Sequence, residues 1–236
     1  MSEGRHIVSA FDDDLITVQA KISEMGGLVE ELLREALEAL KNRDKVLAQT
    51  VIIKDKQLDA MELGLEELST QIIALRQPMA QDLRVLLSAI KIASTLERIG
   101  DLAKNIARRA IYLADAKPVK ISHSIVHMGQ ETLRQLSEIL DAHAQRNAEL
   151  AVDIWNRDVE IDEMYNAIFR EVVTYMMEDS RMIGLGSQLL FVAKNLERIG
   201  DHTTHISEMI CYVVKGEPLG DDRPKGEPLG LGIAPF

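Results

Sequence analysis

A six-residue segment occurs twice in this chain and constrains its fold more than any other feature. The segment Leu96-Glu-Arg-Ile-Gly-Asp101 recurs unchanged one hundred residues later as Leu196-Glu-Arg-Ile-Gly-Asp201. Upstream, Asp55-Lys-Gln-Leu-Asp-Ala-Met61 resembles Asp158-Val-Glu-Ile-Asp-Glu-Met164 at a shift of 103 residues, and a Met-Gly pair recurs at that same shift. A repeat of this kind indicates two copies of one structural unit.

Each copy is predicted to contain three helices, because apolar residues recur at helical spacing and alternating strand patterns are absent. The six expected helices are His6–Leu40, Lys45–Leu75, Met79–Asp115, Ser122–His143, Ala148–Glu178 and Met182–Val214. Capping residues are expected before the second, fifth and sixth helices: Asn42 or Asp44, Asn147, and Asp179 or Ser180. The predicted fold class is all-α, with two tandem three-helix bundles.

The repeat also sets the expected domain organisation. Residues 1–117 are predicted to form the first bundle, residues 118–214 the second, and residues 215–236 a tail. The tail repeats Lys-Gly-Glu-Pro-Leu-Gly at residues 215–220 and 225–230 and is rich in glycine and proline. Such a composition is typical of a flexible segment.

Composition excludes several classes of protein. A net charge of -11 and a pI near 5.1 disfavour binding to nucleic acid or anionic lipid. The single cysteine, Cys211, cannot form an internal disulfide and is expected in the core. Every apolar run is much shorter than the about 18 residues that are needed to cross a bilayer. No secretion signal is recognisable. The expected location is the cytoplasm.

Acidic residues occur in pairs four apart in both copies, which places each pair on one face of a helix. The pairs are Asp55/Asp59, Glu97/Asp101, Asp158/Asp162 and Glu197/Asp201. If the second and third helices form a hairpin about Pro78, Asp59 and Glu97 lie at equal distances from the turn. The second copy shows the same symmetry about its own turn. Four carboxylates are therefore expected at one level in each bundle.

These carboxylates extend apolar stripes, so they are expected to face a groove and to lose part of their hydration. Crowded carboxylates must be protonated, paired with bases or neutralised by a cation. Oxygen ligands select Mg²⁺, Mn²⁺, Ca²⁺ or iron, and Asn105 and His205 are possible further ligands one turn beyond. The alternative is a solvated helix face or an ion-pair network, with Arg98 and Arg198 as partners and no metal.

The two copies differ, and other candidate residues are less informative. Glu62 and Glu66 continue the acidic face in the first copy, where the second has Tyr165 and Phe169. Three further residues are expected to be ordinary helix surface or core: His123, His127 and Trp155. No phosphate-binding loop, dinucleotide fingerprint or nucleophile elbow is present, so catalysis is not predicted.

The chain resembles the PhoU family, the regulatory proteins of bacterial phosphate uptake. The resemblance lies in the two Leu-Glu-Arg-Ile-Gly-Asp segments, in the turn Arg76-Gln-Pro-Met-Ala-Gln-Asp-Leu-Arg84 and in Thr174-Tyr-Met-Met-Glu-Asp-Ser-Arg181. It extends from about residue 5 to residue 215. It implies two three-helix bundles side by side, with Glu/Asp-x-x-x-Asp motifs that bind clusters of iron, zinc or other divalent ions. The ligands would be the eight paired acids, four in each copy.

The resemblance also implies partners. Members of the family are cytoplasmic and often homodimeric adaptors, which restrain the phosphate ABC transporter through its ATPase and keep a sensor histidine kinase silent when phosphate is plentiful. Two rivals stay open. A ferritin-like iron store or oxidase requires Glu-x-x-His motifs, whereas Gly100 and Gly200 stand three residues after Glu97 and Glu197. A structural scaffold would contain no metal.

Overall fold

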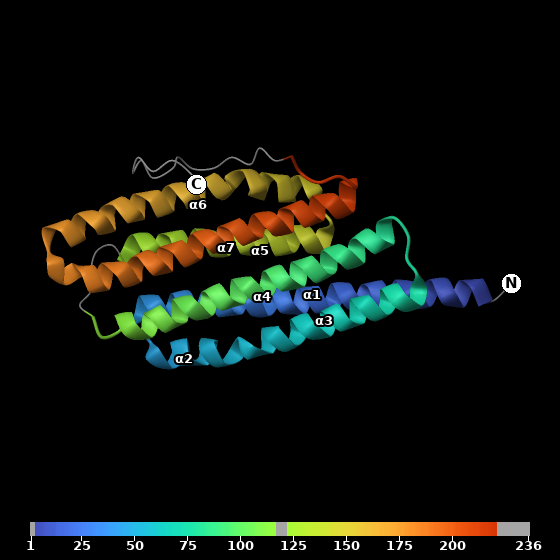
Figure 1. Cartoon of the computed structure of the whole chain (residues 1–236), viewed down its shortest axis with the longest axis horizontal. Helices are drawn as coiled ribbons and strands as arrows, with labels where there is room; N and C mark the ends of the chain where they lie inside the picture. Colours follow the sequence, from blue (N-terminus) through green and yellow to red (C-terminus); the bar gives the residue numbers. More distant parts are fainter. Residues whose placement is uncertain (1–2, 117–121, 221–236) are drawn as a thin grey trace.

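The computed structural model describes residues 3–116 and 122–220, and every regular element in them is helical (Figure 1). The helices are α1 (Glu3–Asn42), α2 (Lys45–Lys54), α3 (Lys56–Arg76), α4 (Gln81–Leu113), α5 (Ser122–Gln145), α6 (Ala148–Glu178) and α7 (Ile183–Lys215), with a short 3-10 helix η1 (Ser180–Met182) before α7. The all-α prediction is confirmed. The boundary expected at residues 117 and 118 and most of the tail lie outside the described residues.

The second predicted helix is interrupted at one residue, Asp55, which separates α2 from α3. The Asp55 amide donates to Val51 O at 3.1 Å, whereas the Leu58 amide donates to Asp55 O at 2.9 Å. The hydrogen bonding thus tightens locally from four-residue to three-residue spacing. The equivalent residue of the second copy, Asp158, lies inside the continuous helix α6.

The helices form two three-helix units that lie side by side (Figure 1). The first unit contains α1, the pair α2 and α3, and α4, and the second contains α5, α6 and α7. The units meet through α4 with α7 and through α1 with α5. In Figure 1, α2 and α3 lie on one outer edge of the molecule and α6 on the other. This arrangement confirms the two bundles expected from the repeat.

Matched caps begin the middle helix of each unit. The Asp44 side chain accepts hydrogen bonds from two α2 amides at 2.9 Å, and Asn147 does the same for α6 at 3.2 and 3.0 Å. The residue before each cap, Arg43 or Arg146, has a positive φ of 59° or 52°. Asp179 caps η1, and α7 begins without a side-chain cap, so the cap expected for the sixth helix acts on the turn before it.

The recurring Met-Gly pairs lie where α1 crosses α5. A Cβ atom on Gly26 would lie 2.6 Å from Leu140 Cδ2, and one on Gly129 would overlap Leu37 Cδ2. Leu37 and Leu140 occupy equivalent positions of the repeat, so the two contacts are reciprocal. A methyl group at either position would require the facing leucine side chain to move. One apolar core runs through both units and includes Cys211, as expected.

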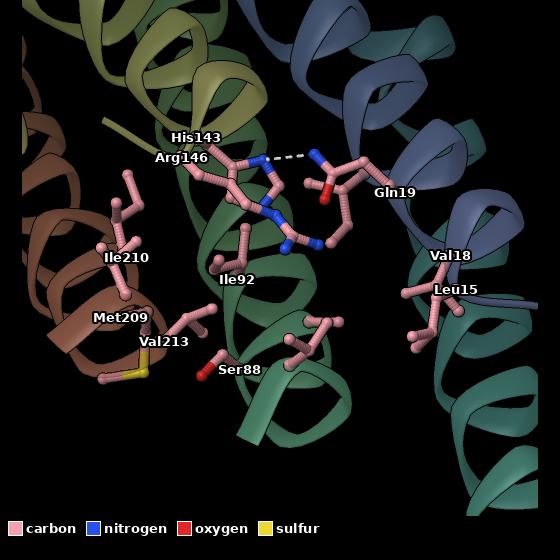
Figure 2. A pocket seen from close by; sticks show the side chains of 14 residues that line it. Leu15, Val18, Gln19, Ser88, Ile92, His143, Arg146, Met209, Ile210 and Val213 are labelled. Carbon is pink, nitrogen blue, oxygen red and sulfur yellow. Dashed lines mark hydrogen bonds between the residues drawn. The ribbon is translucent and has the colours of Figure 1, made fainter. Parts of the chain in front are cut away.

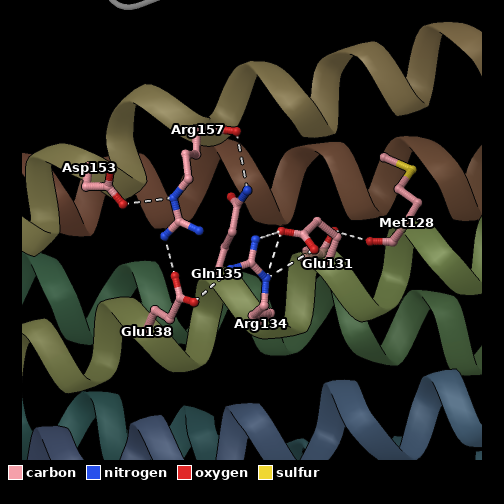
Figure 3. A network of polar contacts seen from close by, with 8 residues as sticks. Met128, Glu131, Arg134, Gln135, Glu138, Asp153 and Arg157 are labelled. Carbon is pink, nitrogen blue, oxygen red and sulfur yellow. Dashed lines mark hydrogen bonds and ion pairs between the residues drawn. The ribbon is translucent and has the colours of Figure 1, made fainter.

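Equivalent ion pairs join the first and second helices of each unit. In the second unit, Arg157 of α6 pairs with Glu138 of α5, and its Nε lies 3.0 Å from Asp153 Oδ2 (Figure 3). In the first unit, Lys54 of α2 lies 2.7 Å from Glu35 of α1 at the corresponding positions. Both cations are only partly exposed, and each connects two helices of its unit.

Candidate metal centre

The first carboxylate cluster forms where the break between α2 and α3 faces α4. Burial raises the pKa of Glu97, and the negative charges of Asp101, Glu62, Asp59 and Asp55 raise it further. All four acids predicted for the first copy therefore lie within electrostatic reach of one another. Glu62 joins them, because it continues the acidic face of α3.

Lys104 of α4 holds this cluster together. Its Nζ donates to Asp55 Oδ2 at 2.5 Å and also donates to Asp101 Oδ1. Burial raises the pKa of Asp55, while the Lys104 ammonium opposes that rise. The hydrogen bonds to Asp101 and Asp55 raise the pKa of Lys104 despite its burial. Sequence reasoning missed Lys104, although its place three residues after Asp101 on one helix was a visible signal.

The second cluster joins α6 to α7. Burial raises the pKa of Glu197, Lys194 opposes that rise, and the charges of Asp201 and Asp162 add to it. Lys194 Nζ donates to Glu197 Oε1 at 2.6 Å. The other carboxylate oxygen, Glu197 Oε2, is buried and has no hydrogen-bond partner in the described part of the chain. An acceptor left in this state favours a cation beside it.

The glycine of each repeated hexapeptide lets the opposing helix approach. A Cβ atom on Gly200 would lie 2.7 Å from Asp158 Oδ1. One on Gly100 would lie 3.5 Å from Asp55 Oδ1 and would overlap Leu58 Cδ1. Asp55 and Asp158 are consequently among the few buried charged residues. The repeated Gly-Asp sequence thus positions one carboxylate of each cluster against the backbone of the neighbouring helix.

The donor set suits a hard or borderline cation, although the side chains are not gathered around one point. In the residues that the structure describes, no three Asp, Glu, His or Cys side chains are arranged to hold a metal ion. Lys104 pairs with Asp55 and Asp101 in the first cluster, and Lys194 pairs with Glu197 in the second. Carboxylate oxygens remain the ligands that Mg²⁺, Mn²⁺ and iron accept.

The two additional ligand candidates have other contacts. Asn105 Oδ1 accepts a hydrogen bond from Arg108 Nη1 at 3.2 Å. The His205 ring meets the His202 ring edge-on, with centroids 5.7 Å apart. Burial lowers the pKa of His202 to about 4, and the neighbouring His205, Arg198 and Arg98 act in the same direction. His202 is therefore neutral at physiological pH.

A separate cavity lies between the two units, at the end where α1 meets α5 (Figure 2). Its volume is about 30 Å³, enough for a single water, and its walls are mostly apolar. Gln19 Nε2 and His143 Nδ1 form a hydrogen bond of 3.1 Å across it. Burial lowers the pKa of His143 to about 4, with a further contribution from Arg146. This polar contact links the first unit to the second.

Comparison with known proteins identifies the family. The family model described as PhoU domain matches residues 22–110 and again residues 125–210. The chain belongs to the PhoU family. The two PhoU matches coincide with the two structural units, so the repeat seen in the sequence is a repeat of the family's domain.

Individual PhoU proteins are similar along nearly the whole chain. The phosphate-specific transport system accessory protein PhoU homolog of Rhizobium meliloti is 48% identical over 94% of each chain. The PhoU accessory protein of Escherichia coli is 39% identical over 94% of this chain and 93% of its own. The crystal structure of PhoU from Pseudomonas aeruginosa matches with a TM-score of 0.85 and 39% identity, and covers 88% of this chain and 100% of that chain.

Among the described residues, none of the helices combines the length and the apolar character needed to cross a bilayer.

Proposed function

We propose that this protein is a regulatory adaptor that restrains phosphate uptake and phosphate-starvation signalling. It docks to the ATPase of the phosphate ABC transporter and to the sensor histidine kinase of the starvation response. The observation that supports this proposal most directly is the PhoU match in both units, together with relatives named as accessory proteins of phosphate-specific transport. The adaptor acts in the cytoplasm, as a homodimer and without catalysis.

Metal binding belongs to the same proposal. The ligands are Asp55, Asp59, Glu97 and Asp101 in the first cluster and Asp158, Asp162, Glu197 and Asp201 in the second, with Asn105 and His205 as possible additions. A divalent or iron-type ion would neutralise charges that the protein crowds together. The raised pKa values of Glu97 and Glu197 and the unpartnered Glu197 Oε2 support this assignment.

Docking through long helices is physically reasonable. Rigid helix faces are common recognition surfaces for partner helices and domains. The net charge of -11 favours partners with basic surfaces. The ferritin-like alternative has less support, because Gly100 and Gly200 occupy the positions where a di-iron site of that class needs histidine, and there they allow close helix packing.

A complementation assay tests the regulatory role. The protein is expressed in a bacterium that lacks its own PhoU protein and carries a reporter of phosphate-starvation transcription. We expect the wild-type chain to lower the reporter signal in phosphate-rich medium. The same chain should retain the purified transporter ATPase and the cytoplasmic part of the kinase in a binding assay. A reporter that stays high with the folded protein present would contradict the proposal.

A pair of quadruple variants tests the role of the clusters. Replacing Glu97, Asp101, Glu197 and Asp201 by alanine should abolish repression. The matched control replaces four exposed acids outside the clusters by alanine: Glu24, Glu38, Asp141 and Glu160. The control removes the same number of charges and should repress normally. Equal repression by both variants would separate the regulatory role from the clusters.

A further inference from the structure

The two carboxylate clusters differ in the residue three positions after the second acid of the hexapeptide. That residue is Lys104 in the first unit and Thr204 in the second. The Thr204 hydroxyl donates to the Asp201 backbone oxygen at 2.8 Å, a contact within its own helix. The first cluster therefore contains a cationic side chain at a place where the second has a neutral hydroxyl.

Lys104 is a shielded cation with two partners. Only 17% of its side chain is exposed, and only 4% of the Asp55 side chain with which it pairs. Its ammonium group donates to Asp55 and to Asp101, which are on different helices. A pair in such a position is expensive to break, because the buried carboxylate that remains would have lost its counter-charge.

The lysine of the second cluster is placed differently. Lys194 is 47% exposed, lies 5.2 Å from the centre of the Tyr165 ring and pairs with Glu197 of its own helix. The equivalent residue of the first unit is Ser94. Lys194 is the more exposed of the two lysines, although its partner Glu197 is only 13% exposed. It also leaves Glu197 Oε2 without a partner in the part of the chain that the structure describes.

We propose that Lys104 acts as a built-in competitor for the cation of the first cluster, so that divalent ions bind the second cluster first and more tightly. A metal ion entering the first cluster must displace an ammonium group that is 17% exposed from a buried aspartate, whereas the ammonium group beside Glu197 in the second cluster is 47% exposed. The inference rests on the proposed metal-binding function and adds a functional difference between two units of the same fold.

The test is a titration of the full-length, metal-free protein with Mn²⁺, followed by electron paramagnetic resonance of the free ion. We expect wild type to show a tight and a weak class of sites that differ at least about tenfold in Kd. Lys104→Thr, which introduces the residue of the second unit, should tighten the weak class about tenfold or more. The tight class should stay unchanged, and Glu197→Gln with Asp201→Asn should remove it.

A control and a second variant complete the design. Lys45→Thr removes a lysine that pairs with Asp115 outside both clusters and should leave both classes unchanged. If Lys104→Thr fails to fold, Lys104→Gln keeps most of the side-chain length without the charge and should tighten the weak class in the same way. The unfolding midpoint of the Lys104 variant should also rise more on adding Mn²⁺ than that of wild type.

The outcomes distinguish the two proposals. Two equal classes in wild type, or a weak class that does not respond to either Lys104 variant, would overturn the role of Lys104 while leaving metal binding intact. A loss of the weak class on removing Lys104 would likewise contradict competition. Absence of Mn²⁺ binding in wild type and in every variant would overturn the metal-binding proposal itself, and this inference with it.

Discussion

Gly200 and Asp158 lie so close that a Cβ atom on the glycine would be 2.7 Å from the carboxylate oxygen Oδ1 of the aspartate. This contact joins α7 to α6 and connects the repeated hexapeptide with the acidic pair of the preceding helix. The hexapeptide thus determines both how closely the helices pack and where a buried carboxylate lies. Its effect on stability can be measured.

Gly200→Ala should destabilise the protein even though alanine favours helix formation. The intrinsic gain is about 0.5–1 kcal/mol, but the added methyl group must displace Asp158 or separate α6 from α7, at a cost of about 1–3 kcal/mol. Gly64→Ala is the matched control, because nothing lies within 4 Å of a Cβ atom at that position of α3. Urea unfolding should show a loss for Gly200→Ala and a small gain for Gly64→Ala.

The contact between Gln19 of the first unit and His143 of the second should make the free energy of unfolding depend on pH. His143 has a pKa of about 4 in the folded protein against 6.5 in the unfolded chain, so the folded state favours neutral imidazole. This contribution is fully present above pH 6.5 and is lost as the pH falls toward 4. By pH 5 the loss should be about 2 kcal/mol.

A substitution taken from the other unit isolates this contribution. His143→Leu introduces the residue found at the equivalent position, Leu40, and removes the titrating group. Urea unfolding at pH 7.5 and pH 5 should show a smaller loss for this variant than for wild type, whereas exposed His127→Leu should follow wild type. Equal losses for wild type and His143→Leu would show that His143 is not held neutral by the fold.

The interface between α4 and α7 provides a third prediction. Arg109 of α4 lies with its Cζ 4.6 Å from the centre of the Phe191 ring and donates to Gln188 Oε1 at 2.7 Å. A double-mutant cycle of Arg109→Ala with Phe191→Leu should give a coupling free energy of about 0.5–1 kcal/mol. The same cycle with exposed Arg108 in place of Arg109 should give a value near zero. Similar coupling free energies in both cycles would mean that the contact of Arg109 with the Phe191 ring does not stabilise the interface between α4 and α7.

Much of the fold could be predicted from the sequence, because an exact repeat and strong helical periodicity act over long segments. Asp44 and Asn147 were identifiable as caps from residue type and position alone. The break at Asp55 was not predictable, since its neighbours have ordinary helix propensity and the change in hydrogen bonding depends on packing. The turn after α3 was predicted at Pro78, but its backbone conformation was not, because Gln77 and Ala80 adopt positive φ values without being glycine.

The sequence predicted which acids lie near one another better than it predicted their contacts with other groups. Helical spacing and hairpin symmetry indicated which acids face one another, and the raised pKa values of Glu97 and Glu197 agree with that grouping. The roles of Lys104 and Lys194 depend on side-chain reach across or along the helices, which spacing alone does not determine. For this reason the sequence predicted crowded carboxylates without the ammonium groups beside them.

The central claim is that the two carboxylate clusters bind metal ions, and elemental analysis of the purified protein tests it most directly. The full chain should be purified without chelator and without a nickel column, beside the variant in which Glu97, Asp101, Glu197 and Asp201 are alanine and the control with four exposed acids replaced. We predict divalent or iron-type metal in wild type and control, and its loss from the cluster variant. Wild-type protein that contains no metal, or a folded cluster variant that retains as much metal as wild type, would contradict the account.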